Sequence, residues 1–108
     1  MSLARIQETL ENVAKAIQAA LGVHVTIVDV NFEKLVSTIG SLGSINSGSA
    51  NAKSINERKL IFIDAPRTHE ACVACGDKEI CKQFAEICAP IIDKDVAIGV
   101  IGLIAYTE

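Results

Sequence analysis

The sequence is short of several residue types, and its low content of basic side chains is informative. It contains no tryptophan, one tyrosine, one methionine and two prolines in 108 residues. Lysine and arginine together number 10 against 13 aspartates and glutamates, which gives a net charge of −3. Because nucleic-acid recognition requires clustered lysine and arginine, we do not expect this chain to contact DNA or RNA.

The sequence also lacks a long hydrophobic run. A membrane-spanning helix needs about 18 or more apolar residues, and the longest apolar segment, 96–106, is interrupted by two glycines. The first eight residues carry acidic and amide side chains where a secretory signal would be continuously apolar. We therefore expect a soluble, cytoplasmic protein that does not enter a membrane. Half of its residues are apolar, which excludes a disordered chain and is enough for one domain.

Hydrophobic periodicity predicts an α+β domain. Apolar residues recur every three or four positions over 3–21, which indicates an amphipathic helix that packs on its own sheet or, alternatively, forms a dimer. From Val23 the period changes to two, and strands are predicted over 23–28 and 34–39. Further strands are predicted over 60–63, at 91–92 and over 96–105. The last of these is apolar on both faces, so we expect it to be central and covered on both sides.

Residues 40–56 are rich in glycine and serine and have few apolar side chains. We predict a flexible loop there; the alternative is a lid that closes over a pocket. The predicted elements assemble most simply into a five-stranded antiparallel sheet with an N-terminal helix and a short helical, cysteine-bearing segment. This plan resembles that of PAS and GAF sensor domains. We predict a single domain, 1–108, with the helix at 1–22 and the cysteine segment at 68–90.

All four cysteines lie close together, in the spacing C-x2-C-x5-C-x6-C from Cys72 through Cys75 and Cys81 to Cys88. In a reducing cytoplasm, such a cluster favours metal ligation over disulfides. An unbroken helix would separate Cys81 from Cys88 by about 10.5 Å along its axis. Two thiolates on one zinc ion lie only about 4 Å apart. A shared site therefore requires the helix expected over 77–85 to end before Cys88, and Pro90 favours that break.

Three kinds of chemistry fit the four thiols. An iron–sulfur cluster, most simply [4Fe–4S], is favoured by the irregular spacing. A structural zinc site is the alternative, although zinc sites more often contain two C-x2-C pairs. The cysteines could also be plain thiols or disulfides. His69, three residues before Cys72, is a candidate alternative ligand or a hydrogen-bond donor to a ligand.

The sequence resembles a known group of proteins in four places: residues 61–69, the cysteines, residues 85–91 and residues 98–105. They are similar to the N-terminal sensory domain of sigma-54-interacting transcriptional regulators from anaerobic bacteria. The resemblance implies output domains elsewhere in a longer regulator, namely an ATPase module and a helix-turn-helix. This sequence contains no G-x4-G-K-[ST] motif, so any ATPase activity would belong to the missing module.

We therefore predict a sensor domain that is not an enzyme and that responds to redox state or oxygen. Cys72, Cys75, Cys81 and Cys88 would bind the cofactor, and the N-terminal helix would form a homodimer. The rival hypothesis is a small-molecule-binding module in which the cysteines are structural. A thiol oxidoreductase is disfavoured, because its C-x2-C motif usually opens a helix in a β-α-β context.

Overall fold

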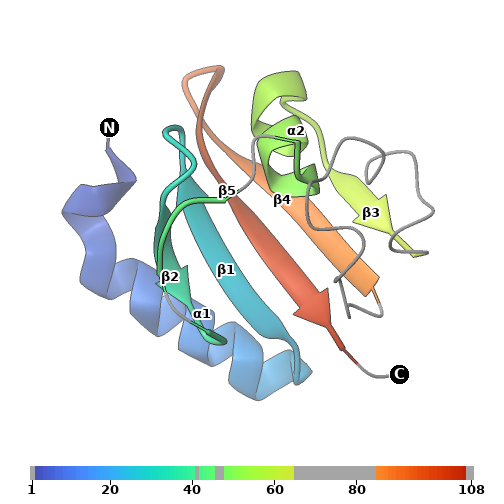
Figure 1. The fold of residues 1–108 in the computed structure, drawn as a ribbon. Helices are drawn as coiled ribbons and strands as arrows, with labels where there is room; N and C mark the ends of the chain where they lie inside the picture. Colours follow the sequence, from blue (N-terminus) through green and yellow to red (C-terminus); the bar gives the residue numbers. More distant parts are fainter. Residues whose placement is uncertain (1, 41, 46–47, 65–84, 107–108) are drawn as a thin grey trace.

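The computed structural model describes residues 2–40, 42–45, 48–64 and 85–106. A short 3-10 turn, η1 (Leu3–Ile6), precedes two helices and five strands: α1 (Gln7–Leu21), β1 (His24–Asp29), β2 (Lys34–Ser37), α2 (Ala50–Glu57), β3 (Ile61–Ile63), β4 (Ala85–Asp93) and β5 (Val96–Ala105). The strands form one sheet in the order β2-β1-β5-β4-β3, and every neighbouring pair is antiparallel (Figure 1).

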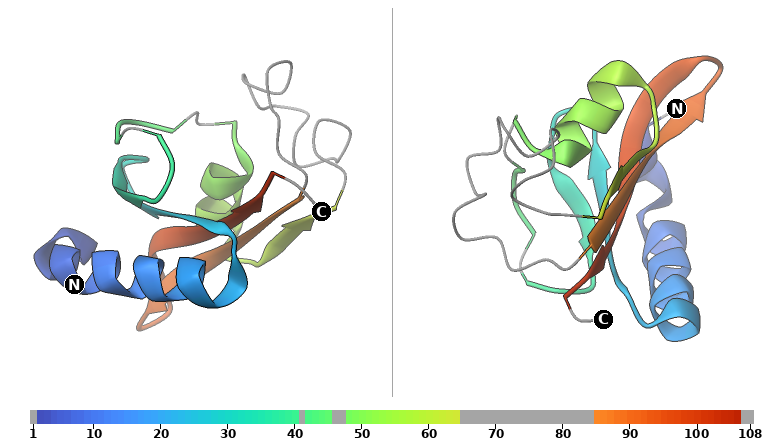
Figure 2. Two further views of the ribbon diagram at one scale, coloured as in Figure 1. Left: turned by 90° about the horizontal axis from the view of Figure 1, so that it is seen from below. Right: turned by 90° about the vertical axis from the view of Figure 1, so that its right-hand side faces the viewer.

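The two helices lie on opposite faces of the sheet (Figure 2). Helix α1 packs on β1 and β2, and α2 packs on β4 and β5. We call the two sides of the sheet the α1 face and the α2 face. The structure confirms the predicted five-stranded antiparallel sheet with an N-terminal helix, and strand β5 is central as expected. Among the described residues, neither helix is long and apolar enough to span a membrane.

The core on the α1 face is made of aliphatic side chains. The buried members of this cluster are Leu3, Leu10, Ala14, Val25, Ile27 and Val36. Helix α1 ends at Gly22, whose φ of 69° lies in the left-handed region and whose N–H donates to the Gln18 carbonyl at 2.9 Å. Glycine tolerates that conformation better than other residues, so it stops the helix where the sequence predicted.

The structure corrects the prediction that residues 40–56 form a flexible loop. Helix α2 occupies 50–57, and the Ser49 hydroxyl caps it by accepting a hydrogen bond from the Ala52 N–H at 3.3 Å. Because Ala50 and Ala52 are small, the helix can lie close to the sheet and bury Ile55. The low apolar content that suggested a loop therefore reflects tight packing of small side chains.

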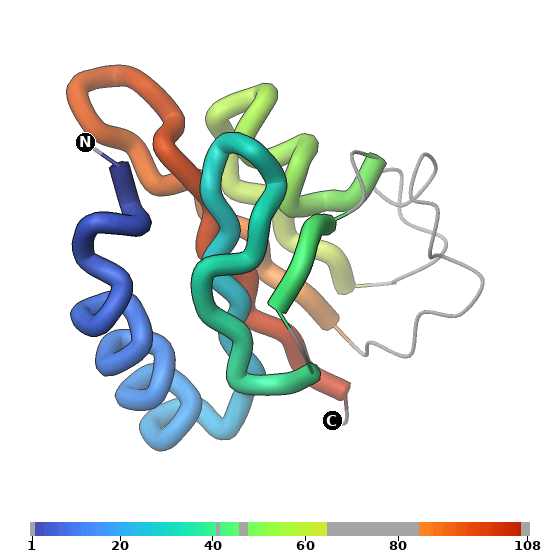
Figure 3. The backbone as a smooth tube through the Cα atoms, turned by 60° about the vertical axis from the view of Figure 1, so that its left-hand side comes forward, coloured from blue at the N-terminus to red at the C-terminus, as the bar shows by residue number. Residues whose placement is uncertain are grey.

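The chain just before α2 is also tied to the sheet. The Lys34 N–H donates to the Gly43 carbonyl and the Ile45 N–H donates to the Phe32 carbonyl, each at 2.7 Å. The Ser44 hydroxyl adds a 2.7 Å bond to the Glu33 carboxylate. Residues 42–45 thus run beside the β1–β2 hairpin (Figure 3).

Strand β4 begins earlier than the sequence suggested and contains Cys88. Cys88 pairs with Ile61 of β3 on one side and with Gly102 of β5 on the other. The chain at Cys88 is therefore extended and not helical, and the metal site shared by the cysteines stays a prediction. His69, Cys72, Cys75, Cys81 and the helix expected over 77–85, apart from Ala85, lie outside the described residues.

Candidate functional site on the α2 face of the sheet

Buried polar side chains gather on one face of the sheet. Four are buried among the described residues: Thr26, Asn51, Ser54 and Glu86. Asn51 and Ser54 belong to α2, and Glu86 and Thr26 project from β4 and β1 on the side that α2 covers. Burying a polar group is costly unless it is hydrogen-bonded. Their concentration on the α2 face, opposite an aliphatic α1 face, makes this the candidate site.

Gly102 of β5 is the point on which two of these side chains converge. A Cβ atom at Gly102 would lie 3.0 Å from Asn51 Oδ1 and 3.5 Å from Glu86 Oε2. The backbone of Gly102 is not in the left-handed region, so its conformation does not require glycine. The missing side chain instead leaves room for Asn51 and Glu86 to approach the central strand.

Glu86 is 6% exposed, and the Cys88 side chain lies close enough to it to affect its ionisation. Burial raises the pKa of the Glu86 carboxyl from 4.5 to about 7, although a hydrogen bond from the Cys88 side chain acts in the opposite direction. A carboxyl with this pKa is present in both protonation states near neutral pH. It can therefore donate a hydrogen bond in one state and only accept in the other.

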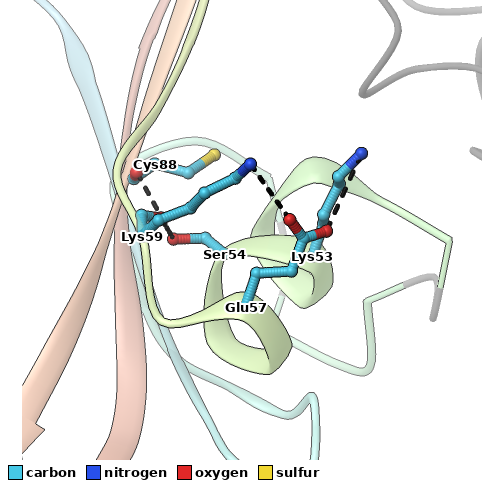
Figure 4. Close-up of polar contacts among 5 residues, drawn as sticks. All are labelled: Lys53, Ser54, Glu57, Lys59 and Cys88. Carbon is cyan, nitrogen blue, oxygen red and sulfur yellow. Dashed lines mark hydrogen bonds and ion pairs between the residues drawn. The ribbon is translucent and has the colours of Figure 1, made fainter.

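Cys88 is completely buried, in a cluster with Ala50, Ile55, Ile61 and Ile63. Ser54 ties α2 to this part of the sheet (Figure 4). Its hydroxyl donates to the Lys59 carbonyl at 2.7 Å and lies 3.4 Å from the Cys88 carbonyl. On the outer side of α2, the Glu57 carboxylate pairs with the Lys59 and Lys53 ammonium groups at 3.1 and 3.8 Å.

Of the predicted ligand set, only Cys88 lies in the part of the chain that the structure describes. No three His, Cys, Asp or Glu side chains gather into a metal site within that part. Sequence reasoning missed Asn51, Ser54, Glu86 and Gly102. One signal was available: Glu86 and Cys88 are two apart in a strand, so their side chains share a face.

Comparison with known proteins finds sequence similarity to a transcriptional regulator. No protein-family model matches the chain. The sequence is 31% identical over 112 positions to UacR of Escherichia coli K12, a protein assigned as a uric acid sigma-54-dependent transcriptional regulator. That alignment covers 98% of this chain and 19% of UacR. The chain thus spans about a fifth of the length of this relative.

Solved structures decide the fold. The GAF domain of A. aeolicus nlh2 in an inactive state matches with a TM-score of 0.72 and 21% identity, over 94% of this chain and 69% of that one. The chain has the GAF fold. This confirms the PAS/GAF-like prediction, and the similarity to UacR confirms the relation of this GAF domain to sigma-54-dependent regulators. The cysteine-containing, anaerobe-type character stays a prediction.

One prediction is overturned by the same comparison. The type II free methionine-R-sulfoxide reductase of Thermoplasma acidophilum matches this GAF domain with a TM-score of 0.75 and 11% identity, over 99% of this chain and 79% of that one. The prediction that the chain is not an enzyme is therefore wrong. It was inferred from absent sequence motifs, whereas an enzyme shares the fold itself.

Proposed function

We propose that this GAF domain is the signal-sensing part of a sigma-54-dependent transcriptional regulator, and that its signal is a small molecule bound on the α2 face. The observation that carries the proposal is the convergence of Asn51 and Glu86 over Gly102. Ligand sites in proteins combine apolar walls with a few well-placed polar groups. Buried apolar side chains, among them Val28, Ile55, Ile63 and Val100, pack on this face, and the polar groups come from α2 and β4.

The relative suggests the chemical class of the signal. UacR carries uric acid in its name, and uric acid is a flat ring bearing several N–H donors and carbonyl acceptors. Asn51 and Glu86 offer complementary acceptors, and the protonated carboxyl of Glu86 also offers a donor. We therefore propose an oxidised purine, or a ring with the same edge chemistry, as the ligand of this domain.

Isothermal titration calorimetry tests the small-molecule proposal. Metal-free chain is titrated with uric acid, and we expect saturable binding of one molecule per chain. Because the sample contains no iron or zinc, this test does not depend on whether the cysteines bind a metal cofactor. A titration that shows only heats of dilution would contradict the proposal.

A second candidate signal is redox state or oxygen, sensed through a cofactor on Cys72, Cys75, Cys81 and Cys88. The position of Cys88 supports it, because β4 pairs this residue with Ile61 of β3 in extended backbone. Burial in apolar surroundings disfavours a lone thiolate, so Cys88 fits ligation where a cation neutralises its charge. When bound, an iron–sulfur cluster would supply reversible one-electron chemistry, and zinc would supply a structural crosslink.

Metal analysis of protein purified without oxygen tests this second candidate. We expect about four iron atoms per chain with visible absorption for a [4Fe–4S] cluster, or about one zinc ion in the alternative case. Cys72→Ser should lose the metal, whereas Ser44→Ala should retain it, because Ser44 is an exposed residue in the segment 42–45 beside the β1–β2 hairpin. Protein with neither metal nor visible absorption would rule out the cofactor.

The remaining proposals concern assembly. Output domains in a longer regulator would receive the signal, as the length of UacR suggests. Helix α1 exposes Val13 and Leu21, at 43% and 63%, and these apolar side chains support the proposed homodimer through this helix. Cytoplasmic localisation stays a prediction.

A further inference from the structure

Helix α2 is held to the sheet by few large side chains. Its buried residues are Ala50, Asn51, Ala52, Ser54 and Ile55. Of these, Ile55 is the single large apolar residue. The core beside α1, in contrast, contains Leu10 and, partly buried, Ile6 and Ile17. Because the stabilisation from burial grows with the apolar area that is buried, α2 is attached to the sheet more weakly than α1.

The buried polar groups of α2 add little to this attachment. Asn51 Oδ1 is inaccessible to solvent and has no hydrogen-bond partner among the residues that the structure describes, and an unsatisfied buried acceptor is destabilising. The Ser54 hydroxyl bonds the Lys59 carbonyl, just beyond the helix, at 2.7 Å, but it lies 3.4 Å from the Cys88 carbonyl of β4. The second distance is long for a hydrogen bond. Movement of α2 away from the sheet would therefore break a weak bond and let water reach Asn51.

The chain leaves α2 through a residue in a disfavoured conformation. Arg58 caps the helix with a φ of 52° and a ψ of 44°, in the left-handed region, where residues other than glycine are strained. Its guanidinium donates a 2.8 Å hydrogen bond to the Asp95 carbonyl, which holds this end of the segment beside the β4–β5 turn. A change in the backbone angles of one such terminal residue redirects a whole helix. Arg58 is therefore placed to act as a pivot.

We infer that α2 is a lid that swings away from the sheet about Arg58 while α1 and the five strands stay folded. Weakly packed segments open in this way at a lower free energy than global unfolding requires. The movement would bring water and solutes to Glu86 and Cys88, which are buried on the α2 face in the closed state. This lid controls access to the α2 face, whichever signal the domain senses.

The thiol of Cys88 can report the opening because it is completely buried. Reduced chain in the presence of a chelator is incubated with iodoacetamide, quenched and digested with trypsin, which cuts after Lys82 and Lys94. Mass spectrometry of peptide 83–94, in which Cys88 is the single cysteine, gives the labelling rate of this thiol alone. Ile55→Ala on α2 and Ile17→Ala on α1 are matched variants that shorten the same type of side chain on opposite faces. Their global stability is measured by urea unfolding.

We expect wild-type Cys88 to be labelled at least about tenfold faster than global unfolding allows. Ile55→Ala should accelerate the labelling at least about tenfold, because it weakens the closed state. Ile17→Ala should leave the labelling rate within about twofold of wild type while it lowers the urea midpoint, because α1 stays folded when α2 opens. Acceleration by Ile17→Ala in proportion to its loss of global stability would overturn the inference, since Cys88 would then be exposed only by global unfolding.

A further variant separates the opening of α2 from that of β3, which also lies beside Cys88. Phe62→Ala shortens an exposed side chain of β3 at the position that pairs with Ile87. We expect it to leave Cys88 labelling unchanged. Acceleration by Phe62→Ala and not by Ile55→Ala would show that β3 opens in place of α2, and this too would overturn the inference. Because no signal molecule is added, either outcome leaves the proposed function standing.

Discussion

Glu86→Gln should stabilise the folded chain by about 3 kcal/mol at pH 8 and leave its stability nearly unchanged at pH 4. The cause is burial, which raises the pKa of the Glu86 carboxyl from 4.5 to about 7. Glutamine resembles the protonated carboxyl in shape and is neutral at every pH. The substitution therefore removes the cost of ionising a buried acid without opening a cavity.

The sign of this effect follows from proton binding. Between pH 4.5 and about 7 the folded state holds the Glu86 proton more tightly than the unfolded state does. The stabilising contribution of the protonated carboxyl is complete below pH 4.5, falls as the pH rises and is lost above about pH 7. The difference in unfolding free energy between Glu86→Gln and wild type should therefore grow across this window and then become constant.

Urea denaturation at a series of pH values from 4 to 8 measures this difference. The matched control is Glu8→Gln, which removes the same charge from an exposed position on α1. Its stability should follow the wild-type pH dependence closely, because the Glu8 side chain is exposed to solvent in the folded chain. Parallel curves for wild type and Glu86→Gln would show that Glu86 is ionised in the folded chain as easily as in the unfolded one.

Gly99→Ala should destabilise the chain by about 2 kcal/mol or more. An added Cβ would lie 2.4 Å from Leu3 Cδ1 and 2.5 Å from the Val28 carbonyl oxygen. Leu3 could adopt another rotamer, but Val28 belongs to β1, which pairs with β5 along its length. Relief of the second contact requires a shift of paired strands, and this makes the substitution costly.

Chemical denaturation of two further variants separates these contacts. Gly102→Ala places its Cβ no closer than 3.0 Å to a side-chain atom, so we expect a smaller loss of stability than for Gly99→Ala. In the background of Leu3→Ala, Gly99→Ala should still cost free energy because the contact with the Val28 oxygen remains. A loss for Gly99→Ala no larger than that for Gly102→Ala would contradict this account.

Helix α1 and the sheet could be predicted because the hydrophobic patterns that indicate them lie within short stretches of sequence. The three- and four-residue spacing over α1 and the continuous apolar run of β5 reflect which faces are buried, and burial leaves a period in the sequence. Helix α2 was missed because its buried residues are the small or polar Ala50, Asn51, Ala52 and Ser54 beside a single large apolar side chain, Ile55. Small residues give a weak hydrophobic signal although they pack closely.

The prediction that the chain is not an enzyme was also wrong because it relied on a limited sequence signal, the absence of known motifs. Motifs identify known arrangements of catalytic groups, and a sequence without them lacks only those arrangements. The GAF fold is shared with a methionine-R-sulfoxide reductase, so the scaffold is compatible with catalysis. Sequence similarity to UacR was more informative about the relatives of this domain, because it extends over almost the whole chain.

The sequence by itself determined the α+β class, the central strand and the end of α1 at Gly22. It also predicted that a metal site shared by the cysteines would require the helix over 77–85 to end before Cys88. These follow from local periodicity, backbone conformation and the geometry of closely spaced thiols. Only the tertiary structure brought Asn51, Glu86 and Gly102 together, because they lie on α2, β4 and β5. The register of β4 against β5 and the packing of α2 across both strands place these residues around one point, and no spacing along the chain encodes that convergence.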